Sequence, residues 1–453
     1  MEETKAVQGA VNVEACALAA GLVGTGGAGF PTHVKLHAKA DVVIANGAEC
    51  EPMLENDRQY MLRHPDKIIR GLRLAMQVTG AQRGIIGVKA KHADIIAQFE
   101  TLLKNEPMIE LHPLQNFYPA GDEHVLVYET TGRVVPAGGI PIDAKAVVNN
   151  VFTLGLLADA AQGKPYTTKY VTVAGEVNTP CVGEVPIGIS IREVIDRLGG
   201  GARISDFSVI LGGPMMGSVC RDLDSPVTKT TGGILVLPSD HRLFSLKNSD
   251  IRRDLNKAKS VCCQCNLCTD LCPRNALGHK LYPSRSMRIL PYLTGQVQME
   301  SIAQAALCTN CGLCQAFACT MSLAPNHVNA FYKKLMTENG YRADVKAMGM
   351  NPVGEFRSIR KVPTPRLADR LGIGDYIQKH LPFVEGCLTA KRLSLPLKMH
   401  IGAPCEPVVS PGDRVSAGQL IAKAPEKGLG TNLHAPMDGI VRSVDGAIVM
   451  ETA

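Results

Sequence analysis

The pattern of apolar and polar positions along the chain predicts both helices and strands. Residues 7–24, VQGAVNVEACALAAGLVG, are mostly apolar and lead into a glycine-rich segment, and we expect a helix there. Residues 170–177, YVTVAGEV, alternate and predict a strand. Residues 336–395 have no clear period and contain the basic, proline-interrupted stretch RSIRKVPTPRLADR, which is typical of a linker or peripheral helices.

The apolar stretches also indicate the cellular location of the protein. No run approaches the roughly 20 residues that a membrane span needs. The first segment contains Glu14 and lacks a basic region followed by a small-residue cleavage site, which argues against a secretory signal, although a docking or encapsulation peptide remains an alternative. We therefore expect a cytoplasmic protein, whose fifteen cysteines serve metals rather than form disulfides.

Length and composition narrow the class of protein. A chain of 453 residues predicts two to four domains, and 45% hydrophobic with 20% charged residues is typical of a globular protein. The net charge of +6 is spread over 48 basic and 42 acidic residues. With no tryptophan and 4% aromatic residues, the chain has little to stack on bases, so nucleic acid is not an expected partner.

Eight cysteines form two runs with the spacing of iron–sulfur proteins. The stretch SVCCQCNLCTDLCP fits C-x2-C-x2-C-x3-C-P, the ferredoxin run, and leaves Cys263 as the surplus thiol. A second run, CTNCGLCQAFACT, repeats the motif with four residues before its last cysteine and Thr320 in place of proline. The predicted cluster ligands are Cys262, Cys265, Cys268, Cys272, Cys308, Cys311, Cys314 and Cys319. A zinc site or a disulfide cluster fits this spacing and compartment less well.

In two-cluster ferredoxins the fourth cysteine of each run binds the other cluster. One [4Fe-4S] cluster is therefore predicted on Cys262, Cys265, Cys268 and Cys319, and the other on Cys308, Cys311, Cys314 and Cys272. The isolated cysteines are expected to be small buried apolar residues: Cys16, Cys50, Cys181, Cys220, Cys387 and Cys405.

A glycine-rich loop, GLVGTGGAGFPTHVKL, follows the first predicted helix. Its missing side chains would let backbone N–H groups approach a phosphate or a flat ring, although a structural turn explains such a loop equally well. It is not the dinucleotide G-x-G-x-x-G fingerprint, because no strand precedes it.

Longer stretches resemble a known family. GGAGFPTHVK, VVIANGAECEPMLENDR, YPAGDEHVLVYETTGR and VVNNVFTL are similar to the flavin-carrying, NADH-binding subunit of respiratory complex I and to the RnfC family of electron-transport proteins. The complex I pattern has an acidic residue where this chain has Ala48. The resemblance implies that FMN is bound by Gly24, Gly26, Gly27, Gly29, Lys35, Asn46, Glu49, Glu51, Gly121, Asp122, Glu123, Asn149 and Asn150, and that Phe30 stacks on nicotinamide.

The resemblance also implies a multidomain α/β fold. The expected parts are a Rossmann-like FMN and NADH domain (1–162), a β-grasp (SLBB) domain (165–240), a ferredoxin-like helical domain with two [4Fe-4S] clusters (245–335), a linker with peripheral helices (336–395) and a C-terminal barrel-sandwich hybrid (396–453). The last part resembles biotinyl and lipoyl carriers, with turns at Pro-Gly, Ala-Gly and Asp-Gly, but Lys427 lacks the flanking residues of a modified lysine.

The order of these domains indicates a function. In the RnfC family the barrel precedes the flavin domain, whereas here it closes the chain, as in the cobalamin reductase family of bacterial propanediol-utilisation microcompartments. That resemblance implies an oxidoreductase in which FMN takes hydride from NADH and two clusters pass single electrons to cob(III)alamin and cob(II)alamin, giving cob(I)alamin for coenzyme B12 recycling. No side chain is required as a general acid or base, so His33, His124, His279 and His434 are expected to be structural.

Two alternative functions are also compatible with the sequence, and the resemblance implies several partners. The chain could instead be an Rnf-type subunit of a membrane NADH:ferredoxin complex, or a non-catalytic cobalamin-binding scaffold. The resemblance to cobalamin reductases implies a corrinoid adenosyltransferase and microcompartment shell proteins as partners, and a location inside a microcompartment.

Overall fold

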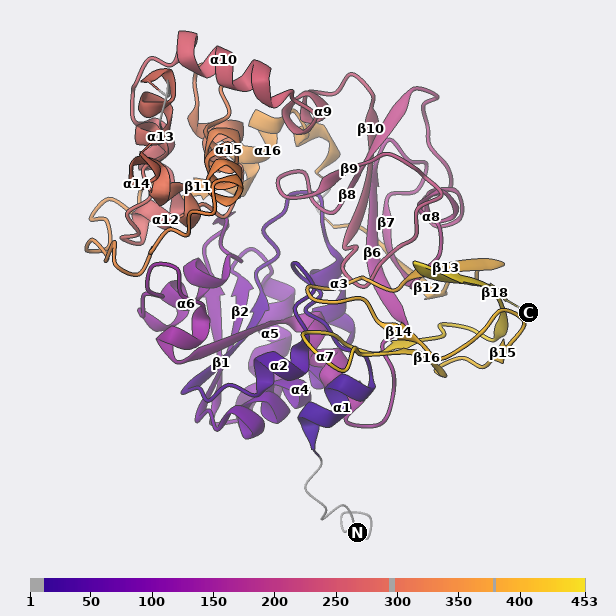
Figure 1. The fold of residues 1–453 in the computed structure, drawn as a ribbon. Coiled ribbons are helices and arrows are strands. Elements are labelled where there is room, and N and C mark those ends of the chain that lie inside the picture. The colour runs from indigo at the N-terminus through magenta and orange to yellow at the C-terminus, as the bar shows by residue number, and fades with distance from the viewer. Residues whose placement is uncertain (1–11, 293–297, 378–379, 453) are drawn as a thin grey trace.

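Four domains make up the molecule, and the chain crosses between them more than once (Figure 1). The structure is a computed structural model and describes residues 12–292, 298–377 and 380–452. The predicted N-terminal helix is present over Val13–Ala19, and the earlier part of that prediction, residues 7–11, lies outside the described residues. Among the described helices, none is long and apolar enough to cross a membrane.

The first domain, residues 13–160, is a parallel sheet covered by helices on both faces. Its sheet has the order β3-β2-β1-β5, and all three pairings are parallel. Its elements are α1 (Val13–Ala19), α2 (Thr32–Leu36), β1 (Val42–Gly47), α3 (Asn56–Arg63), α4 (Pro65–Thr79), β2 (Arg83–Lys89), α5 (Ala93–Leu102), η1 (Leu103–Asn105), β3 (Ile109–Leu114), β4 (Phe117–Tyr118), α6 (Glu123–Thr131), η2 (Pro141–Ala144), β5 (Ala146–Asn150) and α7 (Val151–Ala160).

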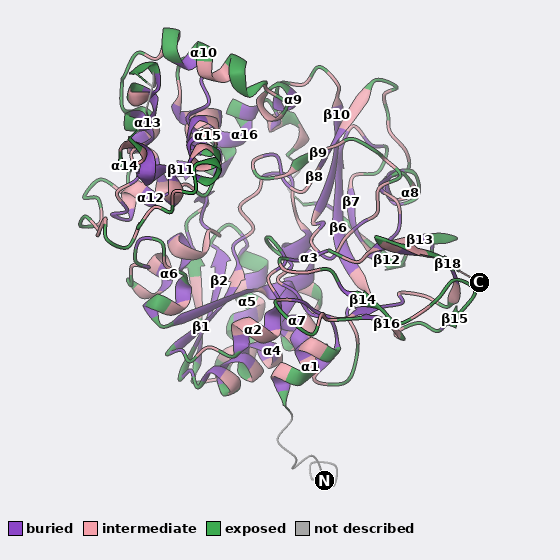
Figure 2. Ribbon diagram, in the orientation of Figure 1, coloured by how far each residue is buried: buried purple, intermediate pink, exposed green. Residues whose placement is uncertain are grey.

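Alternating residues of β1 explain why this sheet needs helices on both sides. Val43 and Ala45 belong to the large core that includes α4 and α7, whereas Val42 and Ile44 pack with Leu126 of α6 in a separate core. A strand whose two faces are both buried is a continuous apolar run, as VVIA is here. The buried strands at the centre of this domain appear in purple in Figure 2.

The second domain, residues 168–238, is a mixed sheet with one helix, as a β-grasp fold requires. The strand predicted from YVTVAGEV is confirmed as β6, which pairs with β7 antiparallel and with β10 parallel. Its elements are β6 (Thr168–Gly175), β7 (Cys181–Pro186), α8 (Ile191–Arg197), β8 (Phe207–Leu211), β9 (Ser218–Cys220) and β10 (Gly233–Pro238).

The cysteine domain, residues 242–338, is helical, and its helices are short because two cysteine loops interrupt them (Figure 1). Its elements are α9 (Arg242–Lys247), α10 (Ile251–Val261), α11 (Leu267–Asp270), α12 (Pro273–Ala276), α13 (Pro283–Ile289), η3 (Leu290–Tyr292), α14 (Met299–Ile302), η4 (Ala303–Leu307), the π-helical turn η5 (Cys314–Ala318) and α15 (Pro325–Glu338).

The segment predicted as a linker, residues 336–395, contributes strands to the sheets of other domains. It contains β11 (Val362–Pro363), α16 (Thr364–Leu371), η6 (Gly374–Tyr376), β12 (Phe383–Cys387) and β13 (Arg392–Pro396). Strand β11 pairs with β4 of the first domain, and β12 is an edge strand of the second domain's sheet beside β7. The predicted helices are present as α16 and η6, whereas the strands were not predicted, because their partners lie far away in the sequence and they leave no local period.

The C-terminal domain, residues 392–452, consists of two small sheets with the orders β13-β19-β18-β15 and β14-β16-β17. It begins before the predicted boundary at residue 396, since β13 pairs with β19 along its whole length. The remaining strands are β14 (Glu406–Pro407), β15 (Arg414–Val415), β16 (Leu420–Lys423), β17 (Leu433–His434), β18 (Gly439–Asp445) and β19 (Ala447–Thr452).

The C-terminal domain packs on the glycine-rich loop of the first domain. The Ile401 N–H donates to the Gly29 carbonyl at 3.3 Å, and a side chain at Gly29 would meet the His400 backbone at 3.1 Å. Lys229 is buried between the two domains, and its amine donates to the carbonyls of Gly21 at 2.7 Å and Asn432 at 2.9 Å. The end of the chain is thus fixed to its beginning.

Candidate functional site

The carboxyl ends of β1, β2 and β5 meet at one edge of the first domain's sheet. In open α/β sheets, ligands bind beyond this edge. Here it presents Asn46 from β1, Lys89 from β2, and Asn149 and Asn150 from β5. The parallel register aligns Asn46 with Asn150, so side chains far apart in the sequence are brought together.

The glycine-rich loop closes over this edge. A bridge between Val23 and Pro31 fixes its base, and the Gly24 N–H donates to the Phe30 carbonyl at 2.9 Å. Thr25 is bound to the first turn of α7, since its N–H donates to the Thr153 hydroxyl at 3.1 Å. The loop is therefore a fixed hairpin and not a free linker.

Two glycines of the loop differ in how much room a side chain would have. A Cβ at Gly26 would lie 3.0 Å from the Asn150 amide nitrogen, so the loop approaches the sheet edge closely there. A Cβ at Gly27 would meet no protein atom within 4 Å. The loop thus leaves an open space beside Gly27, of the kind that a ligand held by backbone N–H groups requires.

Asn150 connects the loop to a buried carboxylate. Its side-chain oxygen caps α7 by accepting from the Phe152 N–H at 2.8 Å, and its amide donates to Asp57 at 2.7 Å. Burial raises the pKa of Asp57, and the nearby Lys169 ammonium partly offsets this. The Lys169 amine in turn donates to the Thr25 carbonyl at 3.3 Å, so buried charges lie directly under the loop.

Sequence reasoning missed the two buried lysines at this site. Lys89 is 1% exposed and Lys169 is 2% exposed, and burial lowers the pKa of each to about 8. Lys89 ends the apolar strand GIIGVK, and a lysine at the end of a buried parallel strand is a signal that could have been used. Lys169 lies in the second domain, and nothing local in the sequence indicates that it reaches the loop.

Lys35 and Asn46, which the family resemblance assigns to the flavin site, bind neighbouring elements of the first domain. The Lys35 amine binds Glu123 at 2.9 Å and the Val148 carbonyl at 2.8 Å, which connects α2 to α6 and β5. The Asn46 amide donates to the Gly121 carbonyl at 3.0 Å, which fixes the second predicted loop beside β1. Their role in binding FMN stays a prediction.

The two predicted glutamates behave differently. Glu49 accepts from the Glu51 N–H at 3.1 Å, and burial, followed by the nearby Asp57 charge, raises its pKa to about 8. Glu51 accepts from the N–H groups of Met215 and Met216, both at 2.8 Å, so its carboxylate lies on a loop of the second domain. Contact of Glu51 with a flavin stays a prediction, and the structure shows it holding two domains together.

Asp122 also has partners within the protein. It caps α6 by accepting from the His124 and Val125 N–H groups, at 3.1 and 3.2 Å. Its other oxygen forms an ion pair with Arg274 of the cysteine domain at 3.0 Å. Nothing in the sequence indicated this pair, which connects the predicted flavin site to the residue following Cys272 and Pro273.

A buried amide at the sheet edge tests whether the site fits FMN. Asn149 is 5% exposed, and its side-chain nitrogen has no hydrogen-bond partner in the described structure. A buried donor without a partner is costly, so it is expected to bind a ligand. The open space at Gly27, the buried amines of Lys89 and Lys169, and this amide fit a flavin with an anionic phosphate.

Two cavities in the cysteine domain group the predicted cluster ligands. The outer cavity is lined by Cys262, Cys263, Cys265, Cys268 and Cys319. The inner cavity is lined by Cys272, Cys308, Cys311 and Cys314. The fourth cysteine of each run thus lies with the other run, as the exchanged ligand sets require.

The backbone of the two cysteine loops repeats the same conformation. Gln264 and Asn266 have left-handed φ angles of 59° and 72°, and Asn310 and Gly312, at the equivalent positions of the second run, have φ angles of 57° and 77°. Left-handed residues are costly unless the fold requires them. Both loops therefore wrap around a centre in the same way.

The chemistry of the thiols fits a cationic centre. Burial raises the pKa of Cys268, Cys272 and Cys311 to about 12, with neighbouring thiols adding to the effect for Cys268. Holding several thiolates at such sites requires a positively charged partner, and an iron–sulfur core supplies one. Within the described residues, no three His, Cys, Asp or Glu side chains converge closely enough for a single metal ion.

The inner cavity lies against the first domain. The Tyr118 hydroxyl donates to the Cys311 carbonyl at 2.8 Å, and Arg274 reaches Asp122 as described above. The rings of His124 and His279 pack in a tilted arrangement at this boundary, with centroids 5.3 Å apart. Burial, followed by the Arg274 charge, lowers their pKa values to about 3 and about 4, so both rings are neutral at physiological pH.

The isolated cysteines follow the prediction only in part. Cys181 and Cys405 are buried, but Cys387 is exposed, which corrects the expectation of a buried residue. Cys387 lies at the end of β12, and an edge strand leaves residues open to solvent.

Comparison with family models identifies each domain. Residues 18–159 match the Nuo51 FMN-binding domain, residues 170–219 the SLBB domain, residues 261–324 a 4Fe-4S dicluster domain, and residues 379–453 the RnfC barrel-sandwich hybrid domain. The predicted domain types are therefore confirmed. Together they define an oxidoreductase that carries FMN and iron–sulfur clusters.

Known relatives match over most of the chain. A protein named cobalamin reductase PduS from Citrobacter freundii is 42% identical over 94% of this chain and 93% of its own length. Its counterpart from Salmonella typhimurium is 40% identical over the same shares. A component of the Na(+)-translocating ferredoxin:NAD(+) oxidoreductase complex from Acetobacterium woodii is 38% identical over 56% of each chain. The chain belongs to the PduS family.

Proposed function

We propose that this protein takes electrons from NADH and passes them singly to cobalamin, reducing cob(III)alamin and cob(II)alamin to cob(I)alamin. The observation that carries the proposal is the grouping of eight cysteines around two cavities, one of which Tyr118 and Arg274 hold against the predicted flavin site. The relatives named cobalamin reductase, which match almost the whole chain, support the choice of acceptor.

Each part of the predicted site has a role in this proposal. FMN, when bound, accepts a hydride and releases electrons one at a time. The backbone of residues 24–29 and the amines of Lys89 and Lys169 would hold and neutralise its phosphate end, while Asn149 would donate to it at the sheet edge. Phe30, half-exposed at the end of the loop, is proposed to stack on the nicotinamide of NADH.

The two histidines between the first domain and the cysteine domain do not take part in proton transfer. His124 and His279 are buried and neutral, so neither supplies a proton at physiological pH. The ion pair of Asp122 and Arg274 instead fixes the distance between the sheet edge and the inner cavity. A fixed distance suits electron transfer, which needs no moving side chain.

Partners and location follow from the same proposal. A protein that makes cob(I)alamin requires an enzyme that uses it at once, and we propose a corrinoid adenosyltransferase as that partner. The PduS relatives support a place inside a propanediol-utilisation microcompartment, with shell proteins as further partners.

An anaerobic titration tests the proposal. Purified, reconstituted protein is titrated with NADH while flavin and cluster absorbance are followed, before and after addition of cob(III)alamin. We expect NADH to bleach both chromophores and the corrinoid spectrum to pass through cob(II)alamin to trapped cob(I)alamin. Bleaching with no change in the corrinoid would reject cobalamin as the acceptor.

The Acetobacterium relative supports a second candidate, an Rnf-type subunit that exchanges electrons with a membrane complex. That candidate predicts that NADH turnover depends on the other proteins of the complex. Full NADH turnover by the isolated chain would exclude it.

A further inference from the structure

The two cluster cavities differ in their access to solvent. The outer cavity is lined by Cys263, Gln264, Cys265, Asn266 and Met321, all of which are exposed. The inner cavity is lined mostly by buried or half-buried residues and faces the first domain. Because electron transfer slows steeply with distance, electrons that enter from the first domain leave by the outer cavity.

Basic residues of α10 and α13 lie beside the outer cavity, since Cys262 at the end of α10 and Ser284 and Met287 of α13 line it. Arg288 donates to the Gln264 carbonyl at 3.1 Å and to the Asn266 side chain at 2.9 Å, and Lys257 donates to the Ser322 carbonyl at 3.3 Å. We define the basic rim as Lys257 and Lys259 of α10 with Arg285 and Arg288 of α13, all of them exposed. Figure 2 shows the exposed side of α10 in green.

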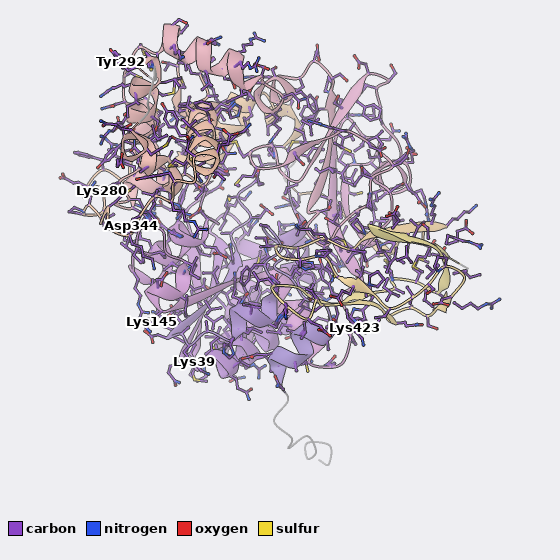
Figure 3. All side chains as sticks on the ribbon, viewed as in Figure 1. Lys39, Lys145, Lys280, Tyr292, Asp344 and Lys423 are labelled. Atoms are coloured by element: carbon purple, nitrogen blue, oxygen red, sulfur yellow. The ribbon has the colours of Figure 1, made fainter. Side chains whose placement is uncertain are left out.

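The charges of the rim are not neutralised within the described residues. In that part of the chain, none of the four cations forms a salt bridge. The acid within α10, Asp254, is half-buried and bound to His327 at 2.6 Å. Tyr292, which follows α13, is 80% exposed (Figure 3).

We propose that the basic rim is the docking site of an acidic protein that accepts electrons one at a time from the outer cavity. This inference rests on the proposed function only in that electrons leave through the clusters. Opposite charges on two proteins raise the rate of encounter by roughly 10 to 10³-fold, and salt screens the effect. An acidic partner fits a rim whose four cations have no counter-ions among the described residues.

Charge reversal away from the hydrogen-bonded positions tests the proposal. Lys259 and Arg285 have exposed side chains with no partner in the described structure, so Lys259→Glu with Arg285→Glu leaves the cysteine loops intact. Lys423→Glu with Lys427→Glu makes the same change in charge on the C-terminal domain, and Figure 3 shows Lys423 far from Tyr292. The acceptors are the soluble acidic domain of cytochrome b5 and the basic cytochrome c, with NADH as donor to the holoprotein.

We expect the rim variant to reduce cytochrome b5 about tenfold more slowly than wild type at low salt, with the difference shrinking at high salt. Reduction of cytochrome c should not fall, and iron content and bleaching by NADH should be unchanged. An equal loss in both double variants, or no reduction of cytochrome b5 by the wild type, would overturn the docking site. Charge-dependent reduction of cytochrome b5 without corrinoid reduction would instead leave the docking site standing and reject cobalamin.

A separate observation concerns the inner cavity. Asn326 and Asn329 line it from α15, one turn apart. The Asn326 amide donates to Asn310 at 3.1 Å, but Asn329 is 0% exposed, and neither its side-chain nitrogen nor its oxygen has a partner in the described structure. A fully buried amide without partners requires an explanation, and the cavity beside it supplies one.

We infer that the Asn329 amide donates to a sulfur of the cluster in the inner cavity. Hydrogen bonds to cluster sulfurs favour the reduced state and raise its potential. Asn329→Leu is therefore expected to lower the reduction potential of one cluster and leave the other unchanged, measured by redox titration with electron paramagnetic resonance.

Asn339→Leu, just beyond the C-terminal end of the same helix, is the control and should change neither potential, because Asn339 is exposed. Unchanged potentials in Asn329→Leu, or an equal shift of both clusters, would overturn the assignment.

Discussion

Replacing Cys265 with serine is expected to remove one iron–sulfur cluster and about half of the bound iron, whereas replacing Cys263 with serine should leave iron content intact. Both thiols are exposed and both line the outer cavity, so neither burial nor position separates them. Only Cys265 has the spacing that places three thiolates around one cluster. Iron and sulfide analysis of anaerobically reconstituted protein measures the effect.

Spectroscopy adds a second readout to this pair of variants. Reduced wild-type protein should show two interacting clusters by electron paramagnetic resonance, and Cys265→Ser should show the isolated signal of the inner one. Equal loss of iron in both variants would mean that the ligand assignment in the outer cavity is wrong.

The second large effect is expected from Gly27→Leu, which should weaken FMN binding strongly without unfolding the protein. A Cβ at this exposed position meets no protein atom within 4 Å, so the side chain enters only the space assigned to the flavin. We expect the affinity for FMN to fall by at least about tenfold, because the backbone can no longer approach the ligand. Flavin content and fluorescence titration of the apoprotein measure this.

Gly354→Leu is the matched control, since Gly354 is exposed and its Cβ would make only ordinary contacts, at 3.5 Å and beyond. Both variants should keep their iron and their thermal midpoint. Full flavin content in Gly27→Leu would show that the loop is a structural turn.

The spacing of residues in the sequence predicted the parts of the site that are formed by residues close together along the chain. Cysteine runs and a strand such as β6 are local patterns, and the pairing of Cys319 with Cys262 and of Cys272 with Cys308 follows from the motif itself. The roles that the family resemblance gives Lys35 and Asn150 in binding FMN stay predictions, and the structure shows them bound to the Val148 carbonyl and to Asp57.

Contacts between domains could not be predicted. Glu51 matches the motif of a flavin residue, yet its carboxylate accepts two N–H groups of a loop that lies far away in the sequence. Lys169 belongs to a strand of the second domain and reaches Thr25 across the boundary. Such contacts depend on how whole domains pack against each other. The periodicity of apolar residues within one segment carries no information about that packing.

The packing of the C-terminal domain on the glycine-rich loop has a consequence for biosynthesis. Residue 401 must be translated before Gly29 gains its backbone partner, and residue 432 before Lys229 gains its second carbonyl. The glycine-rich loop, although it lies near the start of the first domain, therefore lacks these contacts while the second domain and the cysteine domain are being made. A product truncated before residue 401 would leave the Gly29 carbonyl without this partner.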